Sequence, residues 1–281
     1  MTLTRREVLD LLSRHGIRPS QARGQNFVVD PNTVRRVARL AEVGLGDRVV
    51  EVGAGLGSLT LALAETGAAV TAVEVDKRLL VVLREVVADR GVTVVEGDAL
   101  RLDWQELLGS EEWVLAANLP YNIATPLVAT LLDEVPAIRR FVVMVQREVG
   151  ERLAAAPGSG AYGAVSVKVA YWAMAQVVAR VPPTVFWPQP KVDSALVVIR
   201  RRPAGSLLAV DREWLFRLVA TGFGQRRKML RRSLGSLVDA EAFAAAGVSP
   251  EARPEELDVE GWARLAACTR PPSTGGEPRP S

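Results

Sequence analysis

Short runs of β-branched and apolar residues alternate with helical patterns through the first two-thirds of the chain. The runs that we expect to form strands are five or six residues long and lie at 48–52, 69–74, 92–96, 113–117 and 141–146. Near-continuous apolar runs of this length are typical of strands that are buried on both faces of a parallel sheet. Their alternation with helices predicts an α/β fold with a doubly wound sheet.

The helical segments between these runs carry start and stop signals. Asp30 is placed to cap a helix that has Pro31 at its first position. Four apolar residues then fall on one face of that helix: Val34, Val37, Ala38 and Ala41. We expect two further helices at 59–65 and 78–87.

The pattern changes after about residue 201. A linker is expected at 202–205, followed by helices at 212–222, 228–234, 240–245 and 259–268. Compact domains usually run to roughly 100–200 residues, so a chain of 281 residues suits a large domain and a smaller one. We expect a large domain with an N-terminal helical extension over 1–203 and a small helical domain over 204–270. The tail at 271–281 is rich in Pro, Gly and Ser and is expected to be disordered.

Composition narrows the class of protein. Apolar residues make up 48% of the chain, enough for a sizeable core, and no apolar stretch reaches the roughly 18 residues of a membrane span. The first seven residues lack the apolar core of a signal peptide. Cys268 is the single cysteine, which agrees with a reducing compartment, and we expect it to be a buried structural thiol. These features predict a cytoplasmic protein without a membrane partner.

Charge is unevenly distributed along the chain. The net charge is only +3, but residues 200–232 hold ten basic and two acidic side chains, a local charge of +8. The rest of the chain is therefore net acidic. Such segregation is expected of a nucleic-acid binder, although a basic run can also be a solvated helix face.

A glycine-rich turn follows the first expected strand. Gly53-Ala54-Gly55-Leu56-Gly57 leads directly into the helix at Ser58, and such a turn lets the backbone approach a ligand closely. Its G-x-G-x-G spacing departs from the dinucleotide fingerprint, and no Gly-Lys-Ser/Thr of a Walker loop follows. Glu74, 21 positions beyond Gly53, ends the second strand, where an acid can accept from both ribose hydroxyls. Asp98 follows the third strand and can accept from an adenine amino group. Together these features favour an adenosyl ligand.

Asn118-Leu119-Pro120-Tyr121 follows the fourth strand. An adenine exocyclic amine is a poor nucleophile, because its lone pair is delocalised into the ring. The Asn118 oxygen and a backbone carbonyl beside Pro120 can accept its hydrogens and aim the lone pair at a methyl group. Tyr121 can stack on the base, which must first leave its helix. This chemistry needs no metal and no cysteine nucleophile.

Several motifs between residues 18 and 234 carry a resemblance to a known family. They are Gly24-Gln25-Asn26-Phe27, Glu51-Val52-Gly53-Ala54-Gly55, Asn118-Leu119-Pro120-Tyr121, Gln146-Arg147-Glu148-Val149, Ala161-Tyr162-Gly163, Phe186-Trp187-Pro188-Gln189-Pro190-Lys191-Val192-Asp193-Ser194 and Gln225-Arg226-Arg227-Lys228. Together they closely resemble the small-subunit (16S) ribosomal RNA adenine dimethyltransferases. The resemblance implies a Rossmann-like methyltransferase sheet that binds S-adenosylmethionine, with a small helical C-terminal domain that binds RNA.

The resemblance also implies roles for individual residues. The cofactor-binding positions are Gln25, Asn26, Val28, Gly53, Gly55, Glu74, Asp98, Ala99 and Asn118. The target-base positions are Asn118, Leu119, Pro120 and Tyr121, with Phe186 lying against the flipped adenine opposite Tyr121. The clustering of basic residues, and not the resemblance, leads us to expect that phosphates are gripped by Arg226, Arg227, Lys228, Arg231 and Arg232. The implied substrate is a pair of adjacent adenosines in a hairpin near the 3′ end of small-subunit ribosomal RNA. Each adenosine receives two methyl groups on N6. We further expect a monomer without metal that acts in ribosome biogenesis on a pre-30S particle.

Three alternatives stay open at this stage. A large-subunit adenine methyltransferase of the antibiotic-resistance type shares the cofactor and Asn-Leu-Pro-Tyr motifs. A ribosome-assembly factor can keep the fold without catalysis, although the intact Gly53, Glu74, Asp98 and Asn118 argue against that. A nicotinamide oxidoreductase is disfavoured by the glycine spacing.

Overall fold

The chain divides into two compact units. The computed structural model describes residues 2–20, 24–121, 123–203, 205–206 and 209–269. The first unit comprises Met1–Ala154 and Ala173–Arg201, and the second comprises Ala155–Trp172 and Arg202–Ser281. Each unit has a hydrophobic core of its own.

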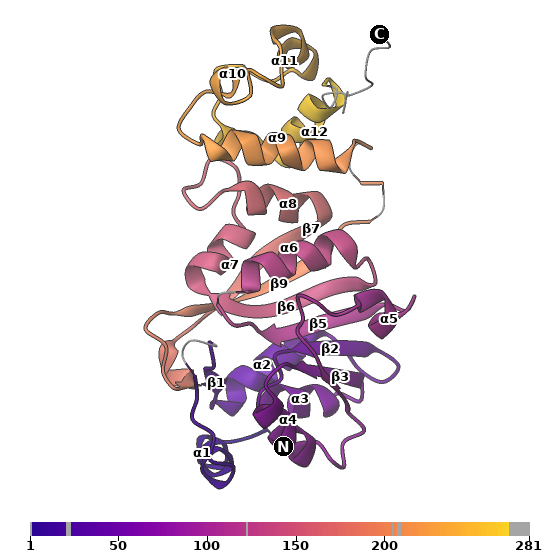
Figure 1. Ribbon diagram of the computed structural model, residues 1–281, viewed down its shortest axis with the longest axis vertical. Coiled ribbons are helices and arrows are strands. Elements are labelled where there is room, and N and C mark those ends of the chain that lie inside the picture. The colour runs from indigo at the N-terminus through magenta and orange to yellow at the C-terminus, as the bar shows by residue number, and fades with distance from the viewer. Residues whose placement is uncertain (1, 21–23, 122, 204, 207–208, 270–281) are drawn as a thin grey trace, which may run out of the picture. The chain divides into compact units, whose positions relative to one another are not determined.

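A seven-stranded sheet forms the centre of the first unit (Figure 1). Its strands, in chain order, are β2 (Arg48–Val52), β3 (Ala69–Glu74), β4 (Thr93–Glu96), β5 (Trp113–Asn118), β6 (Ile138–Gln146), β7 (Ala173–Val181) and β9 (Ser194–Arg201). The spatial order is β4-β3-β2-β5-β6-β9-β7. Strands β4, β3, β2, β5 and β6 are parallel, whereas β9 is antiparallel to both β6 and β7. The α/β prediction is therefore confirmed, and all five expected strands are present.

The strand order reverses between β2 and β5. Chain connections leave β2 toward β3 on one side and reach β5 on the other side. In open α/β sheets, ligands bind in the crevice at the carboxyl ends of the strands beside such a reversal. The sheet therefore provides a binding position at the ends of β2 and β5.

The first unit has seven α-helices among its described residues. They are α1 (Arg5–Arg14), α2 (Pro31–Ala41), α3 (Ser58–Ala64), α4 (Lys77–Val86), α5 (Trp104–Leu108), α6 (Ala124–Glu134) and α7 (Arg147–Leu153). Of these, α3, α4, α5 and α6 connect the parallel strands. As predicted, the Asp30 carboxylate caps α2 by accepting from the Thr33 amide at 2.8 Å. The four apolar residues expected on one face of α2 are all buried. They join α3 and the strands in one apolar core, while α1 and α4 share a second.

A two-stranded sheet lies beside the large one. Strand β1 (Phe27–Val28) pairs antiparallel with β8 (Phe186–Trp187), which follows the short 3₁₀ helix η2 (Pro183–Val185). The register sets Val28 opposite Phe186. This pairing ties the N-terminal segment to a segment more than 150 residues later in the chain.

In the described part of the second unit, all regular elements are helices. Its elements are α8 (Ala164–Trp172), α9 (Arg212–Gly224), α10 (Leu230–Ser233), α11 (Ala240–Ala246), the 3₁₀ helix η3 (Pro254–Glu256) and α12 (Val259–Ala267). The aromatic residues Tyr162, Trp214 and Trp262 are buried in its core. Gly222 on α9 is required there, because a Cβ atom at this position would lie 2.7 Å from the Trp262 ring.

Three sequence expectations differ from the structure. Residues 155–172 belong to the helical unit, not to the large domain that we placed at 1–203, because Tyr162 and Val167 pack in the helical core. The helix expected at 228–234 is only Leu230–Ser233, since turns occupy 225–228. Cys268 is exposed, not buried, because it follows the last turn of α12 and faces away from its apolar side. The tail at 271–281 lies outside the described residues.

Candidate cofactor and target-base site

A cavity of about 410 Å³ lies at the carboxyl ends of β2, β3 and β5. Its volume falls within the roughly 300–1,000 Å³ typical of small-molecule sites. All nine residues that we expected to bind the cofactor line it: Gln25, Asn26, Val28, Gly53, Gly55, Glu74, Asp98, Ala99 and Asn118. The sheet reversal thus brings together positions that are up to 93 residues apart in the sequence.

The glycine-rich turn takes a conformation that favours glycine. Gly53 and Gly55 have φ angles of 73° and 58°, in the left-handed region that other residues rarely adopt. A Cβ atom on Gly55 would also lie 3.3 Å from the Phe27 ring. The glycines therefore let the turn after β2 pack closely against Phe27.

Glu74 is the most firmly held acid of the cavity. Its side chain is buried, and one carboxylate oxygen accepts from the Gly55 amide at 2.8 Å. The other oxygen accepts from the Val75 and Asp76 amides, each at 2.9 Å. Burial raises the pKa of Glu74 above its ordinary value, although these three amides favour the charged form. The amides fix the carboxylate at the end of β3, facing the cavity.

The cavity is also lined by two acids that the sequence did not lead us to expect there. Asp76 follows Glu74 and caps α4 by accepting from the Arg78 amide. Glu51 on β2 is buried, accepts from the Thr60 hydroxyl at 2.5 Å, and has its pKa raised to about 8 by burial. A carboxylate inside the apolar run of β2 was a usable signal for Glu51, whereas Asp76 resembles an ordinary helix cap.

The cavity is therefore acidic. Its described lining includes Glu51, Glu74, Asp76 and Asp98 but no Lys, Arg or His side chain. A dinucleotide brings an anionic diphosphate, which this lining would repel. S-adenosylmethionine brings an ammonium and a sulfonium, so the chemistry of the lining fits that cofactor.

Asp98 differs from the other acids because it is exposed. One carboxylate oxygen accepts from the Leu100 amide at 3.0 Å, which holds the side chain after β4. The second oxygen is available at the edge of the cavity, where we expected an adenine amino group.

Asn118 ends β5 with its side-chain amide in a fixed orientation. Its Nδ2 donates to the Asn26 carbonyl oxygen at 3.1 Å. A carbonyl can only accept, so Oδ1 must face the other way. No described residue donates to Oδ1, which leaves this acceptor for a ligand.

The remaining residues of the Asn-Leu-Pro-Tyr motif divide between two roles. The Pro120 carbonyl accepts from the Ile123 and Ala124 amides at 3.1 and 3.2 Å and so begins α6. No described residue donates to the Leu119 carbonyl, the other backbone acceptor beside Pro120. The Tyr121 hydroxyl lies 3.1 Å from the Ser194 hydroxyl, which ties the motif to the Pro-Lys-Val-Asp-Ser stretch.

Phe186 lies in the hydrophobic core and not in the cavity lining. Its side chain is 3% exposed and packs with Val28, Val34 and Val37. The expected position of Phe186 against a target base, opposite Tyr121, therefore stays a prediction.

The basic run of 200–232 separates into structural and exposed residues. Arg200 pairs with Glu42, and Arg201 donates to four carbonyls at the end of α6 and the start of β6. In the second unit, Arg226 pairs with Glu255 at 2.7 Å and donates to the Gly160 carbonyl. Arg231 lies 3.7 Å from Glu251. Three cations of the run are exposed without a partner among the described residues: Arg227, Lys228 and Arg232.

Two general features concern the described residues only. No helix among them is long and apolar enough to cross a membrane. No group of three or more His, Cys, Asp or Glu side chains there is arranged to hold a metal ion.

Comparison with known proteins places this geometry in a family. Residues 18–270 match the ribosomal RNA adenine dimethylase family. The chain is 51% identical to ribosomal RNA small subunit methyltransferase A of Kineococcus radiotolerans, over 94% of this chain and 91% of that protein. It is 50% identical to the protein of the same name from Cutibacterium acnes, over 89% and 88% of the two chains.

Solved structures agree with the fold. A dimethyladenosine transferase from Plasmodium falciparum has a TM-score of 0.73 at 23% identity, over 84% of this chain and 94% of that one. The 23S rRNA methyltransferase ErmE has a TM-score of 0.69 at 29% identity, over 86% and 99%. With nine-tenths of its length matched, the chain belongs to the ribosomal RNA adenine dimethylase family.

Proposed function

We propose that this protein transfers methyl groups from S-adenosylmethionine to the N6 amines of two adjacent adenosines in small-subunit ribosomal RNA. Each adenosine receives two methyl groups, and the pair lies in a hairpin near the 3′ end of the RNA. The observation that carries the proposal is the Asn118 acceptor at the edge of an acidic cavity. The family and the names of the similar proteins supply the RNA and the subunit.

The cavity residues bind and orient the cofactor. Glu74 accepts from the ribose hydroxyls, and Asp98 accepts from the adenine amino group. The glycine turn at 53–57 lets the backbone approach the amino-acid part closely. When bound, S-adenosylmethionine supplies an electrophilic methyl group on its sulfonium.

The Asn-Leu-Pro-Tyr motif prepares the amine. Asn118 Oδ1 and the Leu119 carbonyl accept the two amine hydrogens of the unmethylated base, or the one hydrogen that remains after the first transfer. These contacts draw the nitrogen toward tetrahedral geometry and turn its lone pair toward the methyl group. At each transfer the nitrogen takes the methyl group from sulfur and gives up one proton to water. These acceptors gain strength as positive charge develops on nitrogen, so they act mainly in the transition state. Tyr121, held through Ser194, stacks on the flipped base, and Phe186 supports the opposite side.

The helical unit supplies the RNA grip. Arg227, Lys228 and Arg232 contact phosphates around the target hairpin and position it without reading its sequence. Arg226 and Arg231 keep a supporting role through Glu255 and Glu251. The protein acts as a monomer in the cytoplasm, on the RNA within a pre-30S particle.

Mapping of methylated adenosines in both ribosomal RNAs tests the function. Cells that lack the gene should lose dimethylation at two adjacent small-subunit adenosines. Wild-type protein should restore it, and so should Asn32→Ala, which changes an exposed asparagine outside the cavity. Asn118→Ala should lower the single-turnover rate about 10²- to 10³-fold at saturating RNA and cofactor, as removal of one preorganised transition-state contact does.

One alternative has an observation in its favour. The similarity to ErmE, a 23S rRNA methyltransferase, keeps large-subunit RNA as a second candidate substrate. The same mapping separates the two: a loss confined to large-subunit adenosines would replace the small-subunit assignment. Unchanged methylation of both RNAs in cells without the gene would remove the catalytic role.

A further inference from the structure

Residues 24–28, called the strap here, pass along one side of the cofactor cavity. All five line the cavity. Phe27 packs on the turn after β2, and Phe27 and Val28 pair with β8. Gln25 and Asn26 also connect the strap to other segments of the first unit through hydrogen bonds.

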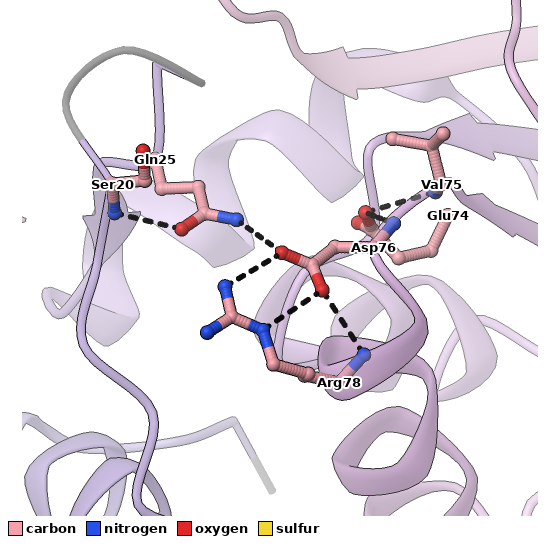
Figure 2. Close-up of polar contacts among 6 residues, drawn as sticks. All are labelled: Ser20, Gln25, Glu74, Val75, Asp76 and Arg78. Carbon is pink, nitrogen blue, oxygen red and sulfur yellow. Dashed lines mark hydrogen bonds and ion pairs between the residues drawn. The ribbon is translucent and has the colours of Figure 1, made fainter.

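Gln25 connects the strap to the end of β3 (Figure 2). Its Oε1 accepts from the Ser20 amide at 2.8 Å, and its Nε2 donates to Asp76 Oδ2 at 3.0 Å. Asp76 also accepts from the Arg78 amide at 3.0 Å and from the Arg78 guanidinium at 3.3 and 3.4 Å. We call the Gln25–Asp76 hydrogen bond the latch.

The latch has a fixed polarity. The Ser20 amide can only donate, so Gln25 must turn its oxygen toward Ser20 and its NH₂ toward Asp76. Burial opposes ionisation of Asp76, but hydrogen bonds from Arg78 and Gln25 outweigh it and lower its pKa to about 2. The carboxylate is therefore charged at neutral pH, and such charge-assisted hydrogen bonds are stronger than neutral ones.

The strap reaches the target-base site through the next residue. The Asn26 carbonyl, one position from the latch, accepts from Asn118 Nδ2 at 3.1 Å. Among the described residues, this contact sets which end of the Asn118 amide faces the cavity. If the strap shifts, the Asn118 side chain can rotate and present its NH₂ group to the N6 amine of the target adenosine. Both groups are hydrogen-bond donors, so the contact that prepares the amine would be lost.

We propose that Gln25 and Asp76 are positioning residues, which hold the strap against the cavity and thereby orient Asn118 for catalysis. This inference rests on the proposed function. Neither residue needs to touch the reacting atoms. The latch serves cofactor binding through the strap's lining residues and serves the methyl-transfer rate through Asn118.

An exchange of the two functional groups tests the latch. Gln25→Glu alone places two carboxylates about 3 Å apart, the separation at which like charges disfavour each other. In Asp76→Asn alone, the side-chain oxygen stays with the Arg78 amide and the NH₂ group faces Gln25 Nε2, so two donors oppose each other. The double variant restores one hydrogen bond with donor and acceptor reversed, and its new carboxylate still accepts from Ser20.

We expect each single variant to weaken S-adenosylmethionine affinity in calorimetry about tenfold, the equivalent of one hydrogen bond to a charged group. The single-turnover rate at saturating cofactor and RNA should also fall about tenfold, within the cost of a small misplacement of reacting groups. Amide hydrogen exchange at residues 24–28 of the cofactor-free protein should accelerate to a similar degree. The double variant should return within about threefold of wild type in all three measurements, since one hydrogen bond to a charged group is restored.

Two further variants isolate the route of the effect. Gln25→Met removes the latch without adding charge. It should lower the methyl-transfer rate of the wild-type protein but not that of the Asn118→Ala variant, because the latch affects the rate only by orienting Asn118. Glu85→Gln removes a surface contact of α4 with Arg14 and His15 and should change none of the measurements.

Wild-type affinity, rate and exchange in folded Gln25→Glu and Gln25→Met would overturn the inference, and so would single losses that the double variant does not recover. A loss of affinity with an unchanged rate would overturn the link to Asn118. If the wild-type protein methylates no ribosomal RNA, the proposed function fails, while affinity and exchange still test the latch.

Discussion

The cofactor cavity and the helical unit use charge in opposite ways. The cavity gathers four acidic side chains, of which Glu51 stays protonated at neutral pH, and each is held by hydrogen bonds from the fold itself. The helical unit presents Arg227, Lys228 and Arg232, which are exposed and have no partner among the described residues. The cavity is acidic and preorganised, whereas this cluster on the helical unit is basic and solvated.

The two ligands that we propose, a cofactor for the cavity and RNA for the helical unit, account for the difference. A small cationic cofactor is recognised at short range in a partly buried site, where fixed charges act strongly and need little reorganisation. RNA is a long polyanion, and proteins bind it mainly through its phosphates and the release of its counterions. Mobile side chains can make such contacts. Substitutions in the cavity should therefore cost specific affinity, whereas those in the helical unit should change salt dependence.

Glu74 gives the larger expected effect. Glu74→Ala would leave the Gly55, Val75 and Asp76 amides without an acceptor. Glu74→Gln keeps one oxygen for the Val75 and Asp76 amides and turns its NH₂ toward the Gly55 amide only, so it is the milder variant. We expect Glu74→Gln to weaken S-adenosylmethionine affinity about 10- to 100-fold, because hydrogen bonds to a charged group contribute roughly 1.5–3 kcal/mol. Calorimetry on the folded variant measures this change.

Glu96→Gln is the matched control. Glu96 lies opposite Glu74 in the register of β3 and β4 but is exposed and pairs with Lys77. The Glu96→Gln variant should bind S-adenosylmethionine with the same affinity as the wild-type protein. Equal affinities in Glu74→Gln and wild type would remove Glu74 from the cofactor site.

Glu51 predicts a pH dependence of the cofactor-free protein. Its pKa is about 8 in the folded state, against an ordinary value of 4.5. Between these values the folded protein holds a proton that the unfolded chain has released, so the stability contributed by Glu51 is lost as pH rises from 4.5 to about 8. The slope is roughly 1.4 kcal/mol per pH unit. Glu51→Gln keeps an acceptor for Thr60 and removes the titration.

The stability difference between Glu51→Gln and wild type should therefore grow in favour of the variant from pH 5 to pH 8. Denaturant unfolding at several pH values measures it, and the other titrating groups cancel in the difference. Stability curves that stay parallel over this range would contradict a buried, protonated Glu51.

Much of the fold could be predicted because its signals are local. The apolar run at 48–52 and the Asp30 cap with Pro31 gave β2 and α2 with correct bounds or nearly so. Strands β7 and β9 were not predicted, and residues 155–172 were placed in the wrong unit. Both depend on packing between distant segments, as when Tyr162 donates to the Leu257 carbonyl.

The candidate site shows the same division. Gly53, Glu74 and Asn118 lie at the carboxyl ends of strands, so their positions could be predicted from the strand pattern alone. The latch could not, because nothing in the sequence near Gln25 indicates a contact with Asp76, 51 residues later. Arg226 shows the opposite case: its basic neighbours predict a phosphate contact, and the structure adds an ion pair with Glu255 that nothing nearby in the sequence indicates.

The basic residues give the smallest effect per side chain and the sharpest test of the comparison. Arg227, Lys228 and Arg232 replaced together by Ala should weaken RNA binding and lower the salt slope of log affinity by roughly 2 to 3, about 0.7–0.9 for each lost phosphate contact. Cofactor affinity should not change, because none of the three lines the cavity.

Arg226→Ala is the control from the same run. Its guanidinium is held by Glu255 and Gly160, so it should leave the slope unchanged and cost about 1 kcal/mol or less of stability. Filter-binding titrations across several salt concentrations measure both variants. If the triple variant keeps the wild-type slope, the exposed cations are only a solvated surface. If Arg226→Ala lowers the slope by a full contact, its ion pair opens to take a phosphate, and the distinction between structural and exposed cations in this run is wrong.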